Sequence, residues 1–272
     1  MSPLPEDLDL ITIQRRLNTR IIGTILMRYE RVASTNDIAK ERARSGYPEG
    51  LTVLAEEQVA GRGRLGRSWV SSYGDALLLS VLLRPVWLPP GEAFSLTMMA
   101  GVALCEAVEQ VASVRAQLKW PNDLLLFADG EWRKSAGILT EVSVADDTIE
   151  WAVVGIGVNV NQTPASAVNG RNLQQTATCV SAAAGRQISR SALLEALLAA
   201  LDERYAQLQS GERGLLFADW RARLARLGEP VTVTLPGGEL RGIAEDVAPD
   251  GTLLLRDAAG VLHMVHTGDV GF

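Results

Sequence analysis

The strongest chemical signal in the chain is a run of alternating glycines and arginines within residues 55–74, AEEQVAGRGRLGRSWVSSYG. Gly61, Gly63 and Gly66 allow the backbone to bend sharply and to approach a ligand closely. The side chains between them are planar guanidinium groups, which suit phosphate or carboxylate: Arg62, Arg64 and Arg67. The residue types therefore predict an anion-binding loop over residues 61–67, which we call the Arg-Gly loop.

The loop also matches the G-x-G-x-x-G spacing, which occurs in dinucleotide-binding loops and in kinases. A dinucleotide-binding loop opens a helix and is followed by an acidic residue about 20 positions later. This loop instead runs into SWVSSYGD and then LLLRPVW. The Lys-Ser or Lys-Thr ending of a phosphate-binding P-loop and the catalytic-loop and DFG sequences of a kinase are missing from the sequence. For the loop taken alone, a solvated Arg-Gly turn is the remaining alternative.

Further polar segments follow a recognisable order along the chain: STN (residues 34–36), KWPND (119–123), KSAGILTE (134–141) and GIGVNVN (155–161). Together with the Arg-Gly loop they resemble the catalytic domain of biotin-protein ligases, in order and in spacing. One such motif would be a chance match, but a series is not. The specific resemblance runs from about Ser34 to Asn161 and continues weakly to Phe272.

The resemblance implies an activity, its substrates and a partner. The chain would activate biotin with ATP as biotinyl-5'-AMP, and would transfer the biotinyl group to a lysine of a biotin carboxyl carrier protein. Mg²⁺ would be bound mainly through the ATP phosphates rather than by protein ligands. A lipoate-protein ligase and a non-catalytic anion-binding or nucleic-acid-binding module are the alternatives. Biotin-dependent exchange of pyrophosphate into ATP would separate the ligase from the binding module, whose affinity would instead fall steeply with salt.

The resemblance also implies which residues form the site. The biotin site would contain Ser34, Thr35, Asn36, Gln58, Gly61, Arg62, Gly63, Arg64, Lys134, Gly137, Gly155 and Gly157. The ATP site would contain Arg64, Arg67, Trp69, Lys119, Asn122 and Asn159. The catalytic residues would be Arg64, Lys119, Asp123 and Lys134, with Arg64 limiting escape of the activated intermediate.

Elementary electrostatics gives these cations a purpose. The biotin carboxylate must attack a phosphate, and two like charges about 4 Å apart repel by ~4 kcal/mol at an effective dielectric near 20. Arginine and lysine side chains would offset that repulsion and stabilise the transition state. A glycine-rich loop that closes over the ligands would also exclude water from the reactive anhydride.

Several of these residues have a plainer structural interpretation. Residues 34–36 are of the types that cap a helix, and Asp123 is either the base that assists the acceptor lysine or a turn-stabilising residue. Gly155 and Gly157 either let the biotin ring lie against the sheet or are packing positions. Trp69 and Trp120 are either core aromatics or walls of the pocket. Leu65 departs from the family pattern, where arginine is usual, and this lowers the positive charge of the loop.

Composition restricts the class of protein. The chain has 272 residues, 47% hydrophobic and 21% charged, which fits a globular protein. The net charge of −6 disfavours nucleic-acid binding over the whole surface. We expect a cytoplasmic protein, because no apolar run reaches the ~18 residues of a membrane span and the N-terminus does not resemble a signal peptide. Cys105 and Cys179 suggest neither a disulfide framework nor a zinc site.

The strand and helix patterns favour an α+β fold. The expected core is a mixed, largely antiparallel sheet with helices on one side, and the resemblance implies a fold like that of class II synthetases. Turns are predicted at Asp129-Gly130 and Asp146-Asp147, and helices at residues 35–45, 94–111, about 190–209 (capped by Ser189 or Ser191) and up to Gly228. Residues 1–228 would form the catalytic domain, and residues 229–272 a small SH3-like β-barrel whose histidines, His263 and His266, are ordinary strand residues.

The resemblance bears on assembly and on DNA as well. Family members that act as repressors carry a helix-turn-helix domain before the catalytic one, and the residues ahead of Ser34 leave no room for it. We therefore expect no DNA partner. The family often forms homodimers, which exposed strand edges would permit.

Overall fold

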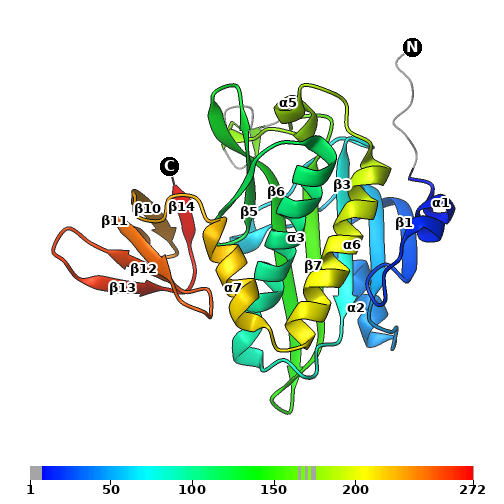
Figure 1. Cartoon of the computed structure of the whole chain (residues 1–272), viewed down its shortest axis with the longest axis horizontal. Helices are drawn as coiled ribbons and strands as arrows, with labels where there is room; N and C mark the ends of the chain where they lie inside the picture. Colours follow the sequence, from blue (N-terminus) through cyan, green and yellow to red (C-terminus); the bar gives the residue numbers. More distant parts are fainter. Residues whose placement is uncertain (1–7, 165–166, 169–170, 173–175, 272) are drawn as a thin grey trace.

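A seven-stranded mixed sheet lies at the centre of the computed structural model, which describes residues 8–164, 167–168, 171–172 and 176–271 (Figure 1). The strand order is β1-β2-β3-β7-β6-β5-β4. The strands are β1 (Ile25–Val32), β2 (Leu51–Gln58), β3 (Ala76–Leu83), β4 (Ala116–Lys119), β5 (Asp123–Ala128), β6 (Glu131–Ala145) and β7 (Thr148–Asn159). Within this sheet β1 and β2 pair in parallel and the other neighbours pair antiparallel. The predicted mixed, largely antiparallel sheet is confirmed.

The residue patterns account for the central strands. Every residue of β3 is buried, as its continuous apolar sequence predicts. Asp129 and Gly130 connect β5 to β6, and Asp146 and Asp147 connect β6 to β7. All four have positive φ, which two-residue hairpin turns require. The two long hairpin strands, β6 and β7, therefore carry the motif residues on adjacent positions of one sheet face.

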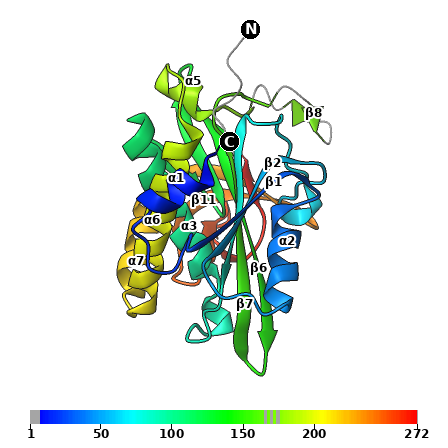
Figure 2. The ribbon, with the colours of Figure 1, turned by 90° about the vertical axis from the view of Figure 1, so that its right-hand side faces the viewer.

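Helices cover both faces of the sheet, so the prediction of helices on one side was wrong. Three helices pack on one face (Figure 2): α3 (Phe94–Ala112), α6 (Arg190–Gln209) and α7 (Arg213–Ala222). On the other face α2 (Thr35–Arg44) buries Ala39 and Ala43 against Val53 and Trp151. The reason is the parallel β1–β2 pair, because parallel neighbours need a crossover connection and α2 supplies it.

The remaining short elements are α1 (Leu10–Arg16), α5 (Val180–Ala184), the 3₁₀ turns η1 (Arg64–Gly66) and η2 (Pro90–Glu92), and the strand pair β8 (Ala167–Val168) and β9 (Arg171–Asn172). The predicted cap of α6 is Ser189, whose side chain accepts a hydrogen bond from the amide of Ala192. Residues 163–184 are rich in Ser, Thr, Asn, Gln and Ala, a composition that predicts a loop and a short helix. Their described part contains α5, and the rest lies partly outside the described residues.

One segment corrects the expectation about apolar runs. By length and composition, Pro90–Ala112 could cross a membrane. In the fold, however, 67% of its most apolar 18-residue stretch is buried. It forms η2 and α3, and its side chains pack against the central sheet and α6. In this structure the segment is the core helix.

A second sheet follows α7. Its strands are β10 (Pro230–Leu235), β11 (Gly238–Val247), β12 (Leu253–Arg256), β13 (Leu262–Val265) and β14 (Asp269–Gly271), in the order β13-β12-β11-β10-β14. We call it the C-terminal sheet. All its neighbouring strands pair antiparallel. The Trp120 indole donates a hydrogen bond to the carbonyl of Gly251 at 2.8 Å, so this sheet docks directly onto the KWPND segment.

The end of α7 differs from the prediction. The helix ends at Ala222, not at Gly228, because the next residues pair with the edge strand β4. Leu118 donates its amide to the carbonyl of Arg223, and Ala225 donates its amide to the carbonyl of Leu118, each at 2.8 Å. Backbone pairing with a distant strand has no local sequence signal.

The cysteines and histidines contact ordinary protein groups. His263 lies in β13, as predicted, whereas His266 lies just beyond that strand, which ends at Val265. Cys105 and Cys179 are buried and free, and burial raises the pKa of Cys105 to about 12. A nitrogen of His263 lies 2.7 Å from Asp257, and one of His266 lies 2.9 Å from the Thr252 hydroxyl. Within the described ranges, no group of three or more His, Cys, Asp or Glu side chains could hold a metal ion.

Candidate active site

The sequence-predicted residues meet around one cavity of about 1230 Å³. The cavity lies between the Arg-Gly loop, one face of strands β5 to β7, and strand β14 of the C-terminal sheet. Every predicted site residue lines it except Gly61. Gly61 is buried at the base of the loop, where its carbonyl accepts a hydrogen bond from the Trp69 amide at 2.9 Å. Its contribution is therefore to the shape of the loop.

The floor of the cavity is made of glycines that two larger side chains cover. A Cβ added to Gly157 would lie 2.6 Å from Cε2 of Trp69, and one added to Gly137 would lie 3.3 Å from the same ring. A Cβ on Gly155 would lie 2.1 Å from Oδ1 of Asn36. Asn36 and Trp69 thus pack closely on Gly155 and Gly157, which fits the alternative that these glycines are packing positions.

We predict that Gly157→Ala destabilises the protein by about 1–3 kcal/mol, the usual cost of overpacking, and displaces the Trp69 indole. Urea-induced unfolding and biotin-dependent pyrophosphate exchange measure the two effects. Gly237→Ala is the matched control, because a Cβ at Gly237 has no neighbour within 4 Å. Equal behaviour of the two variants would contradict the assigned packing of Trp69 on Gly157.

The STN residues form the polar end of the cavity, and Ser80 holds them there. Ser80 Oγ lies 2.7 Å from Thr35 Oγ1 and 2.6 Å from Asn36 Oδ1. The Thr35 amide and hydroxyl both donate to Gln58 Oε1, at 2.7 and 3.0 Å. Ser34 occupies the N-cap position of α2, but its side chain makes no capping hydrogen bond. The cap interpretation is therefore wrong for the Ser34 hydroxyl, although the position is right.

Glu141 joins this polar end to the Arg-Gly loop. Its carboxylate accepts hydrogen bonds from Asn36 Nδ2 at 2.8 Å, Lys40 at 2.9 Å and Arg62 at 3.2 Å. Arg62 also lies 2.6 Å from Asp37. Burial raises the pKa of Glu141, but the hydrogen bonds and charges of its partners outweigh burial and lower the pKa overall. The Asn36 amide is thus used within the protein, and Arg62 anchors the loop to α2.

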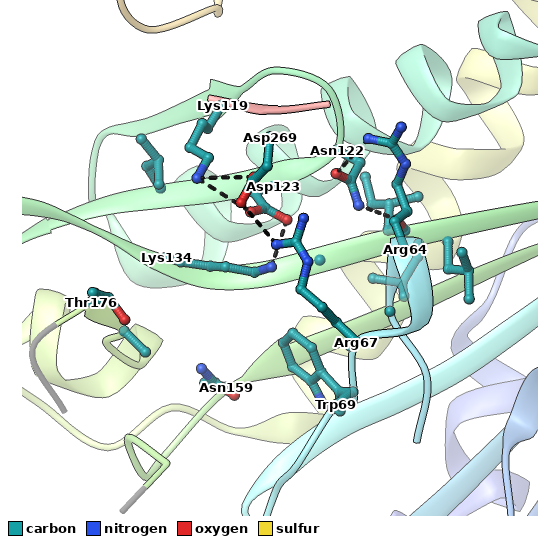
Figure 3. A pocket seen from close by; sticks show the side chains of 18 of the residues that line it. Arg64, Arg67, Trp69, Lys119, Asn122, Asp123, Lys134, Asn159, Thr176 and Asp269 are labelled. Carbon is teal, nitrogen blue, oxygen red and sulfur yellow. Dashed lines mark hydrogen bonds and ion pairs between the residues drawn. The ribbon is translucent and has the colours of Figure 1, made fainter. Parts of the chain in front are cut away.

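A chain of alternating charges forms the other end of the cavity (Figure 3). Lys134 Nζ lies 2.6 Å from Asp123 Oδ1, and Lys119 Nζ lies 3.9 Å from Asp123 Oδ2. Lys119 Nζ is also 3.4 Å from Asp269 Oδ1, and Arg67 Nη1 is 2.9 Å from Asp269 Oδ2. The Asp123 side chain is only 5% exposed. Four predicted residues and one unpredicted residue, Asp269, therefore form a single electrostatic unit.

Arg64 lies beside this unit and contacts two segments. Its guanidinium is 3.4 Å from Asn122 Oδ1 and 3.3 Å from Thr267 Oγ1. Asn122 in turn donates to the carbonyl of Ile138 at 2.6 Å. Burial lowers the pKa of Arg64, while the charge of Asp123 opposes that shift. Arg64 is thus a partly desolvated cation, whose charge acts strongly on a neighbouring anion.

Asn159 offers an acceptor for a ligand. Its Nδ2 donates to the carbonyl of Thr178 at 3.1 Å, which fixes the amide, and its Oδ1 is buried without a hydrogen-bond partner among the described residues. A buried carbonyl oxygen of this kind requires a donor, which the exocyclic amine of a nucleobase would supply.

The structure also shows where the two motif tryptophans and Leu65 lie. Trp120 is 3% exposed and belongs to the core, whereas Trp69 is a wall of the cavity. Leu65 is 53% exposed and lines a small groove beside Leu235 and Pro236, not the main cavity. Leu65 therefore does not reduce the positive charge of the cavity lining, because this position is not part of it.

Asp269 gives the site a pH-dependent contribution to stability. Burial raises its pKa, but the charges of Lys119, Arg67 and Lys134 outweigh burial and bring the pKa below 3.8. The contribution of Asp269 to stability is therefore fully present above the pKa of an aspartate in the unfolded chain, near 3.9. It is lost as pH falls through the lower pKa of Asp269 in the folded chain.

We predict that the difference in Tm between the native chain and Asp269→Asn shrinks as pH falls from 7 to 3. A difference that stays constant with pH would contradict this assignment.

The fold and the site match one class of protein. The model of the Biotin/lipoate A/B protein ligase family matches residues 29–159, and that of the Biotin protein ligase C terminal domain matches residues 227–272. These matches cover the central sheet with its motifs and the C-terminal sheet. They define a ligase class that includes enzymes for both biotin and lipoate.

Individual relatives narrow the class. The chain is 36% identical over 242 residues to the biotin--[acetyl-CoA-carboxylase] ligase of Mycobacterium tuberculosis, covering 87% of this chain and 85% of that protein. It is 32% identical to the bifunctional ligase/repressor BirA of Bacillus subtilis, covering 93% of this chain and 76% of that protein. The structure of the Aquifex aeolicus biotin protein ligase in complex with biotin and ATP superposes with a TM-score of 0.74 at 26% identity, covering 91% and 97%. The chain belongs to the biotin protein ligase family.

Proposed function

We propose that this protein is an ATP-dependent ligase that converts biotin to biotinyl-5'-AMP and transfers the biotinyl group to a lysine of a biotin carboxyl carrier protein. One observation carries the proposal: a single cavity joins a neutral hydrogen-bonding end, Thr35 and Gln58, to a cluster of cations around Lys119 and Lys134. A neutral ring with a carboxylate tail and a nucleotide would be bound end to end there.

The polar end suits the biotin ring. Thr35 and Gln58 are fixed by each other and by Ser80, so they are held ready for a ligand without further ordering. The Trp69 ring lies on Gly157 and Gly137 between this end and the cations. For a biotin ring to reach the sheet, the indole must shift. Its buried Nε1 has no partner among the described residues, so the shift breaks no hydrogen bond of the indole.

The cationic end suits the reaction between biotin and ATP. Lys134 is 34% exposed and lies 5.8 Å from the centre of the Trp69 ring, so its ammonium faces the space where a carboxylate tail would end. Lys119, Arg67 and Arg64 would neutralise the phosphates, and Asn159 would accept from the adenine amine. The carboxylate would then attack the α-phosphorus, and pyrophosphate would leave.

The two carboxylates of the charged unit are committed to lysine and arginine side chains. Asp123 is paired with Lys134 and Lys119, and Asp269 with Lys119 and Arg67. This donor set fits a Mg²⁺ ion that is held chiefly by ATP phosphates. When bound, the ion would supply positive charge at the leaving pyrophosphate.

Asp123 is better described as a positioning residue than as the base of the transfer step. Both its oxygens face ammonium groups and its side chain is buried. The carboxylate would orient Lys134 towards biotin and Lys119 towards the nucleotide. The turn-stabilising interpretation has less support, because the hydrogen bonds and ion pairs described for Asp123 are to lysines.

The acceptor protein, the compartment and the assembly remain predictions from the family. We propose a carrier domain of a biotin-dependent carboxylase as acceptor, a cytoplasmic location, no DNA partner and a possible homodimer. We also propose a division into a catalytic domain, residues 1–228, and a C-terminal domain, residues 229–272. The break falls between α7 and β10, where the central sheet gives way to the C-terminal sheet.

Exchange of labelled pyrophosphate into ATP tests the proposal. We expect exchange that depends on biotin and that lipoate does not support. Adding a carrier domain should then transfer the biotinyl group to one lysine, seen as a mass increase. A purified, folded protein with no biotin-dependent exchange would refute the ligase assignment, and exchange supported by lipoate instead would move the chain to the other branch of the class.

A further inference from the structure

The segment between the last two strands of the C-terminal sheet reaches the Arg-Gly loop. Asp269 begins β14, and its carboxylate is 2.9 Å from Arg67. Two residues earlier, the hydroxyl of Thr267 is 3.3 Å from Arg64. These pairs are 202 and 203 positions apart in sequence. Two arginines of the loop therefore end on one three-residue segment of another sheet.

The rest of the loop has few other attachments to the protein. Backbone hydrogen bonds from Gly63 to Arg67 and from Trp69 to Gly61 close the loop on itself. Among the described residues, the side-chain hydrogen bonds that tie it to other segments come from its three arginines: Arg62 to α2 and β6, Arg64 to Asn122 and Thr267, and Arg67 to Asp269. The position of the loop over the cavity therefore depends on what those arginines hold.

The Asp269 contact is of the kind that holds a loop firmly. Its side chain is 14% exposed and that of Arg67 is 35% exposed. Exposed ion pairs contribute little because solvent screens them, whereas a desolvated, charge-assisted hydrogen bond is strong. Asp269 is also 3.4 Å from Lys119, so two cations that face the cavity share one carboxylate from the C-terminal sheet.

We propose that residues 267–269 form a clasp, in which Asp269 holds Arg67 and Thr267 holds Arg64, and that this clasp keeps the Arg-Gly loop closed over the activated intermediate. Asp269 is a positioning residue, since it acts through Arg67. The C-terminal sheet thereby sets how much biotinyl-5'-AMP escapes before transfer. The inference rests on the proposed function and assigns it a retention device.

The clasp predicts a separation of two measurable quantities. Without the Asp269 charge the loop opens more often, so the intermediate is lost faster. The substitution removes an anion and no cation from the cavity, and Arg67 and Lys119 are both still available to phosphate when the loop is closed, so the KM for ATP does not rise. We expect Asp269→Asn to increase release of biotinyl-5'-AMP by about tenfold or more, as expected for losing one hydrogen bond between charged groups. The rate of pyrophosphate exchange should change less than about threefold.

The experiment uses the full chain and two readouts. Release is followed as free biotinyl-5'-AMP and as biotin on serum albumin, with no carrier present, and the first step is followed by pyrophosphate exchange at varied ATP. Asp269→Glu should restore retention. Glu239→Gln is the matched control, because Glu239 is a carboxylate of the same sheet whose partner, Arg241, is on the surface. It should leave both readouts unchanged.

A double-mutant cycle separates a clasp from a general weakening of the C-terminal sheet. If Asp269 acts through Arg67, Asp269→Asn adds nothing to release in an Arg67→Gln background. Thr267→Val tests the second half of the clasp through Arg64, and does so even if Asp269→Asn fails to fold.

Three outcomes would overturn the proposal: unchanged release in folded Asp269→Asn and Thr267→Val, a higher KM for ATP without extra release, or an undiminished Asp269→Asn effect in the Arg67→Gln background. Failure of the proposed function would look different, because the native chain itself would then show no biotin-dependent exchange.

Discussion

Replacing Lys134 with methionine should reduce biotin-dependent pyrophosphate exchange by about 10²–10³, the usual loss when one charge-stabilising donor is removed from an active site. Lys134 is the cation between the Trp69 ring and Asp123, with its Nζ 2.6 Å from Asp123 Oδ1. Lys119 lies on the other oxygen of Asp123 and beside Asp269, so it does not occupy the place of Lys134 beside Trp69. The chain has three lysines in all, Lys40, Lys119 and Lys134, and Lys40 pairs with Glu141 on the opposite side of the Arg-Gly loop.

The same substitution also removes the nearest partner of a buried carboxylate. The Asp123 side chain is 5% exposed, and stranding a buried charge costs about 3–5 kcal/mol. A loss of activity could therefore reflect instability. Lys134→Met combined with Asp123→Asn removes both charges, so we expect thermal stability to recover while exchange stays low. If exchange recovers with stability, Lys134 only neutralises Asp123 and has no direct role in activating biotin.

Local sequence patterns predicted most of the sheet, because its signals are short-range. The apolar run of β3 and the two Asp-containing turns each specify an element within about ten residues. The motif residues also come together because β5, β6 and β7 are joined by those tight hairpins. Register then places Gly137 opposite Gly157, where Trp69 packs.

The parts that the sequence did not predict depend on contacts between distant segments. Ser80 lies in an otherwise apolar run and was not among the predicted site residues, yet it fixes Thr35 and Asn36 from 45 and 44 positions away. Glu141 lies at the end of a recognised motif but had no assigned partner. Asp269 belongs to a strand of the C-terminal sheet, and its approach to Arg67 follows from how two sheets dock. A buried polar residue inside an apolar strand was the one available signal for Ser80.

Arg64→Gly should release biotinyl-5'-AMP and label bystander proteins. The substitution removes the contacts of Arg64 with Asn122 and Thr267 and also introduces a flexible residue next to Leu65, whose φ is 55°. Loss of hydrogen bonds to a charged group costs about 1.5–3 kcal/mol, which shifts loop opening by about 10- to 100-fold. We expect biotin on serum albumin to rise by a similar factor, while carrier labelling continues.

Arg64→Gly also predicts where the released intermediate will not react. The side chains of Lys40 and Lys119 are 14% and 15% exposed, that of Lys134 is 34% exposed, and all three are ion-paired with carboxylates. A paired, protonated ammonium is a poor nucleophile, so the chain itself should acquire little biotin.

Arg241→Lys in the Arg64→Gly background supplies an exposed amine, because the Arg241 side chain is 77% exposed. Mass spectrometry should find biotin at residue 241 of that variant and little elsewhere in the described chain. Equal labelling of Lys119 or Lys134 would mean that the cavity lysines are open to attack, and that retention rests on something other than a closed loop.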